Sequence, residues 1–239
     1  MKTVVSIGGS VLVPDLDAGR VEEFADVVES LADAGQDLGI VVGGGPVARQ
    51  YIGAARDLGA NEGELDQLGI DTTRLNARLL LAALDEDLAA PSIPENYEQA
   101  AEALHRDSVV VMGGVVPAQT TDAVSAALAE YVDADRLVFA TSVPGVFDAD
   151  PNEDPDAERY DEIEASELVD LIARGESLGS AGSNAPIDLL AAKVIKRSGI
   201  DAIVLDGTDP SAVERALLDG EFDGRSEEHT SELQSLSHI

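Results

Sequence analysis

Three glycine turns are the residues of this sequence whose types and spacing point most directly to chemistry. They lie in TVVSIGGSV (3–11), GIVVGGGPVARQYI (39–52) and SVVVMGGVVPAQTTDA (108–123), each between an apolar run and a segment with helical periodicity. Glycine lets a ligand approach the backbone, and the free N–H groups at the start of the next helix attract anions. One such turn is as readily a plain tight turn, but three at strand exits favour phosphate binding.

Two familiar phosphate motifs fit these turns poorly. The P-loop signature GxxxxGK[ST] is absent, and no lysine follows any of the glycine turns. Residues 43–48, GGGPVA, satisfy G-x-G-x-x-A, and Asp66 follows at about the spacing of a ribose-binding acid. In a dinucleotide fold that acid ends a second strand, whereas residues 62–84 have a helical pattern. A dinucleotide-dependent dehydrogenase therefore stays as a weakly supported alternative.

The charge of the chain excludes one class of partner. It has 47 acidic against 15 basic side chains and a net charge of −32. Binding to a nucleic-acid backbone needs a basic stripe, so we expect no nucleic-acid partner. We interpret the acidity as a halophile's surface, on which salt screens the self-repulsion. Stability is then expected to fall in low salt.

The end of the chain differs in composition from the rest. Residues 225–239, RSEEHTSELQSLSHI, are rich in serine and histidine, have no apolar period and resemble a translated sequencing adapter. A disordered tail is the alternative. Two of the three histidines fall there, which leaves His105 and disfavours a histidine metal site or base. We predict one domain over residues 1–224 and a non-native or disordered tail over 225–239.

Cysteine usage and hydropathy indicate a cytoplasmic protein. The sequence has no cysteine, which excludes disulfides and thiolate zinc sites. It also has no run of 18 uncharged apolar residues, and its N-terminus lacks the apolar segment of a signal peptide. We therefore expect no membrane partner and a cytoplasmic location.

The elements that must position the glycine turns follow from hydrophobic periodicity. Short, nearly all-apolar runs predict strands buried on both faces at 3–7, 38–42, 108–112, 136–141 and 200–205. Helical patterns occupy 19–34, 46–58, 64–84, 95–104, 122–133, 165–174 and 186–198. This alternation predicts an α/β fold, a three-layer α/β/α sandwich with a mostly parallel central sheet. The acidic stretch 147–162 is expected to be a surface excursion or short hairpin.

Several longer motifs carry a resemblance to a known family. The stretches are SIGGSVL (6–12), VVGGGPVARQYI (41–52), IDTTRLNARLLLAAL (70–84), VMGGVVPAQTTDAVSAALAEYVDAD (111–135), ATSVPGVFDADP (140–151) and DLLAAKVIKRSG (188–199). Together they resemble the amino acid kinase family over residues 1–224, and most closely its archaeal-type uridylate (UMP) kinases. The glycine-rich strand ends are common to the family. The motifs within 111–135 and 140–151 are more specific, and together they single out UMP kinases from acetylglutamate, carbamate or aspartate kinases.

The resemblance implies a reaction and its partners. It implies transfer of the ATP γ-phosphoryl group to UMP, giving UDP and ADP, with Mg²⁺ bound to the ATP phosphates and with no metal site made by protein side chains. It also implies a homohexamer. A non-catalytic anion-binding or storage protein on the same fold is the alternative, because the family includes such a protein.

The resemblance also implies the site residues. Asp122 and Lys193 are expected to be catalytic, although Lys193 is as readily a surface lysine. Bacterial relatives carry a lysine in the first strand, where this sequence has Ser6, so the source of the stabilising cation is open. The residues expected to bind UMP are Gly44, Asp66, Gly114, Val115, Val116, Pro117, Ala118, Gln119 and Thr120. Those expected to bind ATP are Gly9, Ser10, Gly45, Arg49, Thr141, Phe147 and Asp150.

Overall fold

The computed structural model describes residues 1–149, 154, 156–177 and 187–221. Within them, five strands form one sheet in the order β3-β2-β1-β4-β5, and every neighbouring pair is parallel. The strands are β1 (Lys2–Ile7), β2 (Asp37–Val42), β3 (Val109–Met112), β4 (Arg136–Thr141) and β5 (Asp201–Asp206). All five predicted strands are confirmed to within one residue at either end.

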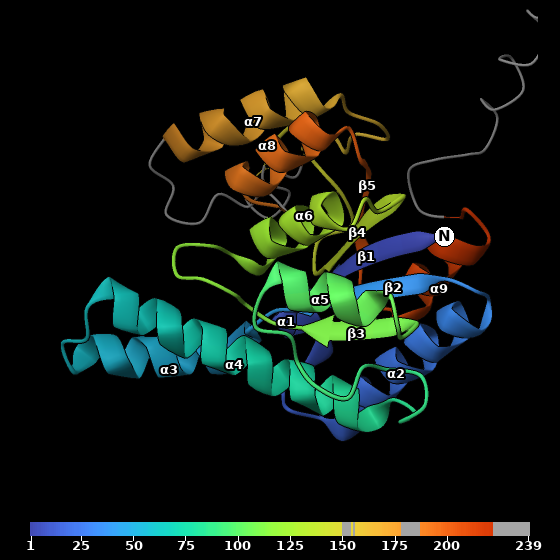
Figure 1. Ribbon diagram of the computed structural model, residues 1–239. Helices are drawn as coiled ribbons and strands as arrows, with labels where there is room; N and C mark the ends of the chain where they lie inside the picture. Colours follow the sequence, from blue (N-terminus) through green and yellow to red (C-terminus); the bar gives the residue numbers. More distant parts are fainter. Residues whose placement is uncertain (150–153, 155, 178–186, 222–239) are drawn as a thin grey trace, which may run out of the picture.

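Helices cover both faces of this sheet, as the alternating pattern predicts (Figure 1). Seven of them match the predicted helical segments. The helices are α1 (Gly9–Leu12), α2 (Ala18–Asp33), α3 (Gly45–Asp57), α4 (Glu62–Ala83), α5 (Tyr97–Leu104), α6 (Thr121–Tyr131), α7 (Ala165–Ser177), α8 (Leu189–Ser198) and α9 (Ser211–Leu218). The hydrophobic pattern predicted neither α1, which is a single turn of four residues, nor α9.

Each face of the sheet has its own hydrophobic core. Side chains alternate between the faces of a strand, so Val5 packs with α2, α4 and α9, whereas Val4 packs with α5, α6, α7 and α8. Val41 and Val42 divide between the two cores in the same way. The chain thus forms the three-layer α/β/α sandwich that was predicted.

Capping side chains account for several helix starts. Asn61 and Glu64 form a reciprocal capping box at the start of α4. Thr120 accepts a hydrogen bond from the Ala123 N–H, and Asp188 accepts one from the Ala191 N–H. These bonds satisfy backbone donors that a helix leaves unpaired at its N-terminus.

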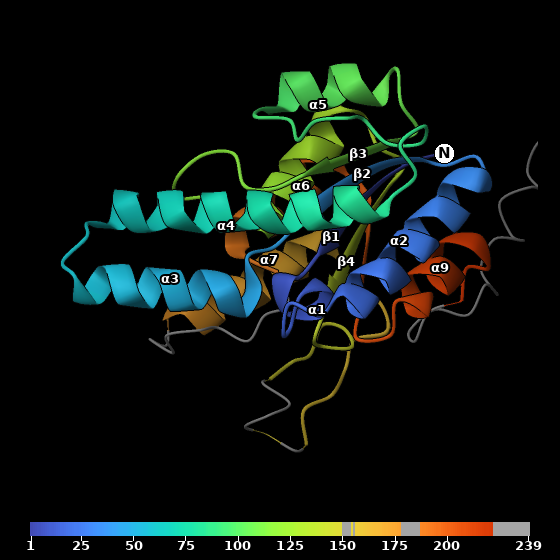
Figure 2. The same ribbon diagram turned by 90° about the horizontal axis from the view of Figure 1, so that it is seen from below.

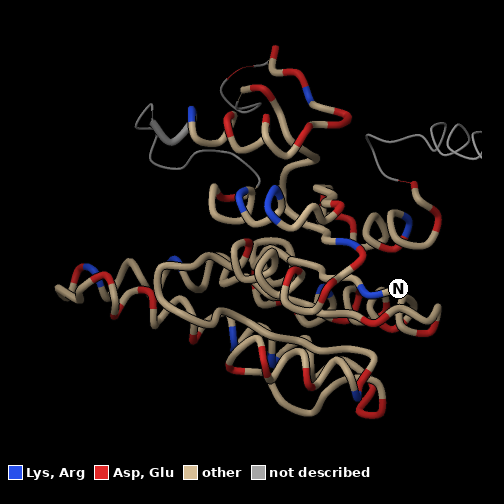
Figure 3. Tube along the Cα trace, turned by 45° about the horizontal axis from the view of Figure 1, so that its top comes forward, with Lys and Arg blue, Asp and Glu red and all other residues tan. Residues whose placement is uncertain are grey.

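Two features of the surface bear on function. Helices α3 and α4 run side by side and project beyond the sheet (Figure 2). Acidic residues are distributed along the described part of the trace, and basic ones are few (Figure 3). Among the helices of the described residues, none combines the length and apolar character that a membrane crossing requires.

Candidate active site

The predicted glycine turns meet at the point where the strand order reverses. β1 lies between β2 and β4, so the chain runs outward from it in both directions. The Gly8 N–H donates to the Ala140 carbonyl over 3.0 Å, and the Gly43 N–H donates to the Ile7 carbonyl over 2.9 Å. Ligands of open α/β sheets bind outside the carboxyl ends of the strands at such a point. The topology therefore confirms that the turns share one edge of the sheet.

The first two turns pack directly against each other through their backbones. A Cβ atom built on Gly9 would lie 2.3 Å from the Gly45 nitrogen, and one on Gly45 would lie 2.4 Å from the Gly9 carbonyl oxygen. Gly45 also has a φ of +63°, which L side chains adopt rarely. The interpretation that glycine leaves room for a ligand needs a correction here. At these two positions the missing side chains first allow one turn to contact the other.

Helix α4 connects the second and third turns through two buried polar side chains. Asn76 donates from Nδ2 to the carbonyls of Gly43 and Gly44, over 2.8 and 3.1 Å. Thr73 accepts at Oγ1 from the Gly114 N–H over 2.7 Å. Neither Thr73 nor Asn76 was predicted as a site residue. Their signal was two polar residues three apart on a helix face that is otherwise apolar.

A cavity of about 290 Å³ lies between these turns, α3 and α4. Most of the residues that were predicted to bind UMP line this cavity, but Val115 and Pro117 do not. Two residues predicted for ATP, Gly45 and Arg49, line it as well. The cavity lining consists of Gly44, Gly45, Ala48, Arg49, Ile52, Asp66, Gly69, Ile70, Thr73, Gly114, Val116, Ala118, Gln119, Thr120 and Thr121.

Two features make this cavity suitable for an anion. Gly44 is the N-cap of α3 and supplies no side-chain cap, so the N–H groups of the first turn keep their capacity for a ligand, apart from Pro46, which has none. Arg49 is exposed one turn into the same helix and forms no hydrogen bond or ion pair with any residue that the structure describes. A guanidinium with free donors beside a helix N-terminus can bind a phosphate group through two parallel hydrogen bonds.

Asp66 connects α4 to the loop between β3 and α6. Its Oδ2 accepts a hydrogen bond from the Ala118 N–H over 2.9 Å. Ala118 has a φ of +63°, which is unusual for a residue with a side chain. Asp66 thus holds this loop in its bent conformation, and its Oδ1 accepts no hydrogen bond from the part of the chain that the structure describes.

Asp122 lies in the first turn of α6 and contacts the strand that leads into the first glycine turn. The Ser6 hydroxyl donates to its Oδ1 over 3.2 Å. Burial, and to a smaller extent the nearby Asp188 carboxylate, raise the pKa of Asp122 to about 7, against the lowering effect of the Ser6 hydrogen bond. Asp188 itself accepts hydrogen bonds from the Thr120 hydroxyl and from the Ala191 N–H. Hydrogen bonds to these two carboxylates therefore connect β1 with α6, and the start of α6 with the start of α8.

The other residues predicted for ATP or catalysis are more dispersed. Gly9 and Ser10 begin α1, and Thr141 ends β4. Phe147 forms an isolated antiparallel bridge with Arg159, and Asp150 lies outside the described residues. Lys193 is exposed on α8 and does not line the 290 Å³ cavity.

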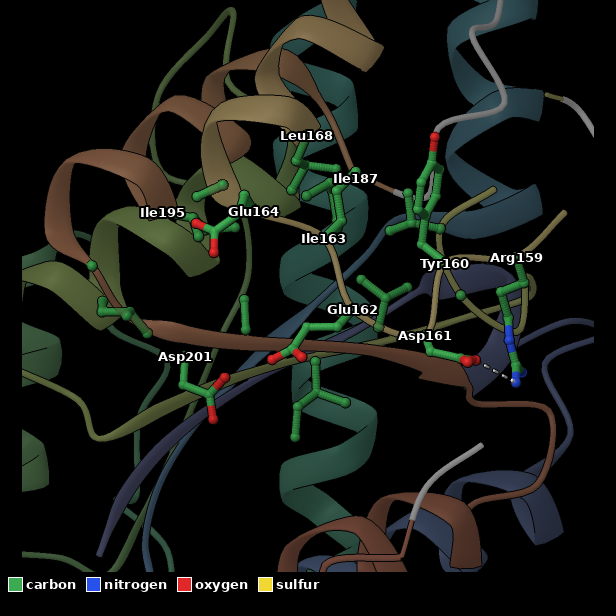
Figure 4. A pocket seen from close by; sticks show the side chains of 18 residues that line it. Arg159, Tyr160, Asp161, Glu162, Ile163, Glu164, Leu168, Ile187, Ile195 and Asp201 are labelled. Carbon is green, nitrogen blue, oxygen red and sulfur yellow. Dashed lines mark ion pairs between the residues drawn. The ribbon is translucent and has the colours of Figure 1, made fainter. Parts of the chain in front are cut away.

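A second cavity, of about 370 Å³, lies beside the edge strand β5 (Figure 4). The residues that line it include Arg159 but also the acidic side chains Asp161, Glu162, Glu164 and Asp201. None of the residues predicted for ATP, UMP or catalysis is among them. Carboxylates repel a polyphosphate, so this larger cavity is a poor nucleotide phosphate site.

The comparisons with known proteins agree with this geometry. The model of the amino acid kinase family matches residues 1–206. The chain belongs to the amino acid kinase family. It is 67% identical over 224 residues to the uridylate kinase of Haloarcula marismortui, which covers 94% of this chain and 97% of that protein. It is 64% identical to the uridylate kinase of Halobacterium salinarum, over 94% of this chain and 92% of that protein.

Two solved structures share this fold over most of the chain. The crystal structure of uridylate kinase from Archaeoglobus fulgidus superposes with a TM-score of 0.83 at 43% identity, covering 94% of this chain and 98% of that one. A UMP kinase from Bacillus anthracis superposes with a TM-score of 0.75 at 23% identity, over 92% and 93% of the two chains, and supports the fold alone.

Proposed function

We propose that this member of the amino acid kinase family is a UMP kinase, which transfers the γ-phosphoryl group of ATP to UMP and releases UDP and ADP. The names of its relatives support this reaction. The observation that carries the proposal is the 290 Å³ cavity. It brings together an uncapped helix N-terminus, an arginine with no ion-pair partner among the described residues, and the loop that ends at Thr120.

The acceptor nucleotide is assigned to this cavity. The UMP phosphate lies at the N-terminus of α3, where Gly44 and Arg49 supply donors. Asp66 accepts a hydrogen bond from the ribose with the oxygen that Ala118 leaves free. The loop from Gly114 to Thr120 surrounds the base. Arg49, which was predicted for ATP, thus contacts the acceptor phosphate in this assignment.

The donor nucleotide is assigned to the neighbouring strand ends. Gly9, Ser10 and Gly45 offer backbone N–H groups and a hydroxyl to the ATP phosphates, next to the acceptor phosphate. Thr141, Phe147 and Asp150 are assigned to adenosine. An oxygen of the UMP phosphate attacks the γ-phosphorus, and the bond from that phosphorus to the β–γ bridging oxygen breaks. Most of the catalysis comes from positioning the two nucleotides and from neutralising the charge of their phosphates.

Asp122 and Lys193 are assigned to the charge balance of this transfer. Ser6 occupies the strand position at which bacterial relatives carry a lysine, and here it donates to Asp122. The carboxylate of Asp122 orients cationic groups around the transferring phosphoryl group. Lys193 is the candidate cation, because α8 starts at Asp188, which is hydrogen-bonded to Thr120.

Mg²⁺ is assigned to the ATP phosphates. Among the described residues there is no group of three or more His, Cys, Asp or Glu side chains placed to hold a metal ion. Mg²⁺ at kinase sites is bound by substrate phosphates and water together with one or two carboxylates. When bound, the ion neutralises charge that develops on the phosphate oxygens.

The quaternary structure and location are proposals of the same kind. We propose a homohexamer in the cytoplasm, supported by the family resemblance and by the absence of cysteine from the sequence. Light scattering after size exclusion in molar KCl tests the assembly, since a monomer at micromolar concentration contradicts it.

A coupled assay for ADP tests the reaction against its alternatives. We expect turnover with ATP and UMP, and no comparable turnover with N-acetylglutamate. Tight nucleotide binding without turnover supports the storage or binding protein instead. The dinucleotide-dependent dehydrogenase is not supported, because Asp66 lies inside α4 and not at the end of a strand.

A further inference from the structure

A fourth turn lies at the same edge of the sheet as the three glycine turns. It follows β5 and contains Gly207 and Thr208. The Gly207 N–H donates to the Thr141 carbonyl over 2.7 Å. A Cβ atom built on Gly207 would lie 2.8 Å from the Ala140 Cβ and 3.0 Å from the Val11 Cγ1. The fourth turn therefore packs against the end of β4 and against α1, the helix that begins in the first glycine turn.

The side chain of Arg20, in the first turn of α2, connects α1 to this fourth turn. Its Nε donates to the Val11 carbonyl over 3.0 Å. Its Nη2 donates to the carbonyls of Gly207 and Thr208, over 2.9 and 2.7 Å. Because a guanidinium group has donors and no acceptor, the direction of these three hydrogen bonds is fixed. Only 16% of the side chain is exposed, and the guanidinium lies over the Phe24 ring, 5.1 Å from its centroid.

Helix α1 needs such a connection, because it consists of a single turn. A helix of four residues gains little from its own hydrogen bonds, since the first turn is the costly one to form. The Val11 carbonyl is among the last carbonyls of α1, which a helix leaves without an internal partner. A cation at this end of a helix is also favourable. Arg20 therefore stabilises the far end of α1, whose near end holds Gly9 and Ser10.

We propose that Arg20 is a positioning residue for the donor nucleotide. By binding the three carbonyls it fixes α1 against the fourth turn, which keeps the backbone of Gly9 and Ser10 in place for the ATP phosphates. This inference rests on the proposed function, because it uses the assignment of these two residues to ATP. Neither Arg20 nor any of its three carbonyl partners lines the 290 Å³ cavity assigned to UMP. Substitution of Arg20 should therefore affect ATP more than UMP.

The test compares KM for ATP and KM for UMP in wild type, Arg20→Lys and Arg20→Ala. Arg20→Lys keeps the charge and the apolar stem, but it replaces the planar fork by a single ammonium nitrogen. We expect KM for ATP to rise about 3- to 10-fold in Arg20→Lys, the value of one net hydrogen bond, and further in Arg20→Ala. KM for UMP should stay close to the wild-type value. If Arg20→Ala does not fold, Arg20→Lys decides the test alone.

Glu23→Ala is the matched control on the same helix. The Glu23 carboxylate accepts a hydrogen bond from Nη1 of Arg20 over 3.0 Å and is itself largely exposed. The control variant therefore removes the ion pair of Arg20 and keeps its three bonds to backbone carbonyls. Both of its KM values should equal those of wild type.

Two results overturn the inference. In the first, the Arg20 variants leave KM for ATP unchanged. In the second, they raise KM for ATP and KM for UMP by the same factor, as a general loss of structure does. A wild type that turns over no UMP refutes the proposed function instead, and dissociation constants for ATP, measured by calorimetry, then decide the inference. Weaker binding by Arg20→Lys than by Glu23→Ala supports it, whereas equal values, or no binding by wild type, overturn it.

Discussion

The cavity beside β5 and the cavity beside α3 differ in size and in chemistry, and the smaller one, beside α3, has the features of a nucleotide site. The 370 Å³ cavity beside β5 is lined by four carboxylates and one arginine, whereas the 290 Å³ cavity combines glycine backbone, a helix N-terminus and Arg49. In a chain of net charge −32, a cavity with more backbone N–H groups than carboxylates is a distinctive feature. Volume is therefore a poorer guide to the site than the local balance of donors and charges.

The largest effect is expected from breaking the backbone contact beside the smaller cavity. In Gly9→Ala the new Cβ would lie 2.3 Å from the Gly45 nitrogen, so both turns must move. We expect kcat/KM for UMP to fall more than about 10²-fold, because displaced positioning groups cost that much. The free energy of unfolding should also fall, by about 1–3 kcal/mol. Steady-state kinetics and chemical denaturation measure the two effects.

Gly53→Ala is the matched control for that substitution. Its Cβ would meet nothing within 4 Å, and the position lies inside α3. Alanine in a helix interior stabilises by about 0.5–1 kcal/mol relative to glycine. Activity close to wild type in Gly53→Ala, with loss in Gly9→Ala, separates the close contact from a general intolerance of alanine.

The next largest effect is expected from the charge of the smaller cavity. Arg49→Ala should lower kcat/KM for UMP about 10- to 100-fold, because a charge-assisted hydrogen bond to phosphate is lost. Arg56→Ala serves as control on the same helix, since Arg56 forms an ion pair with Glu62 at the far end of α3. Equal kinetics for the two variants would remove Arg49 from the site.

A smaller effect is expected on the pH dependence. Asp188→Asn keeps an acceptor for the α8 N-cap but removes one cause of the raised pKa of Asp122. If the ionised Asp122 is the working form, wild-type activity rises with pH through about 7. The variant should then reach half of its maximum at lower pH, with about tenfold higher relative activity at pH 6 at most. The titration of the UMP phosphate affects wild type and variant equally, so it cancels when their pH–rate profiles are compared.

The same carboxyl gives a stability prediction of defined sign. The pKa of Asp122 is raised from 3.8 to about 7 in the folded state. Between these values the unfolded chain loses the proton and the folded chain keeps it, so the free energy of unfolding falls as pH rises. Denaturant titrations from pH 4 to pH 8 should show a smaller decrease in Asp188→Asn than in wild type. An equal decrease would show that Asp188 does not influence Asp122.

The smallest effect is expected at the larger cavity. Neutralising its lining with Asp161→Asn and Glu164→Gln should leave kcat/KM for UMP unchanged, since no nucleotide phosphate is assigned there. Wild type should melt at a lower temperature in dilute buffer than in molar KCl, because salt screens repulsion between carboxylates. The double variant should reduce that difference by about 1–3 °C. Loss of activity in this variant would place a ligand in the larger cavity.

The sequence predicted the strands and the shared edge of the glycine turns because both depend on local patterns. Apolar runs and exit glycines are visible in one segment at a time, and parallel topology then brings the turns together. The side chains that complete the cavity depend on contacts between distant segments. Thr73 and Asn76 reach the turns from α4, and Tyr97 reaches Gln119 from α5. Hydrophobic periodicity places such residues on a helix, but it does not show which distant residue each one contacts.

The most direct measurement is a crystal structure with UMP and a non-hydrolysable ATP analogue bound together. We expect the UMP phosphate at the N-terminus of α3 beside Arg49 and the pyrimidine against Gln119. The ATP γ-phosphate should lie next to the UMP phosphate, at Gly9 and Gly45. Electron density for UMP in the cavity beside β5, or for the two nucleotides at separate edges of the sheet, would contradict it.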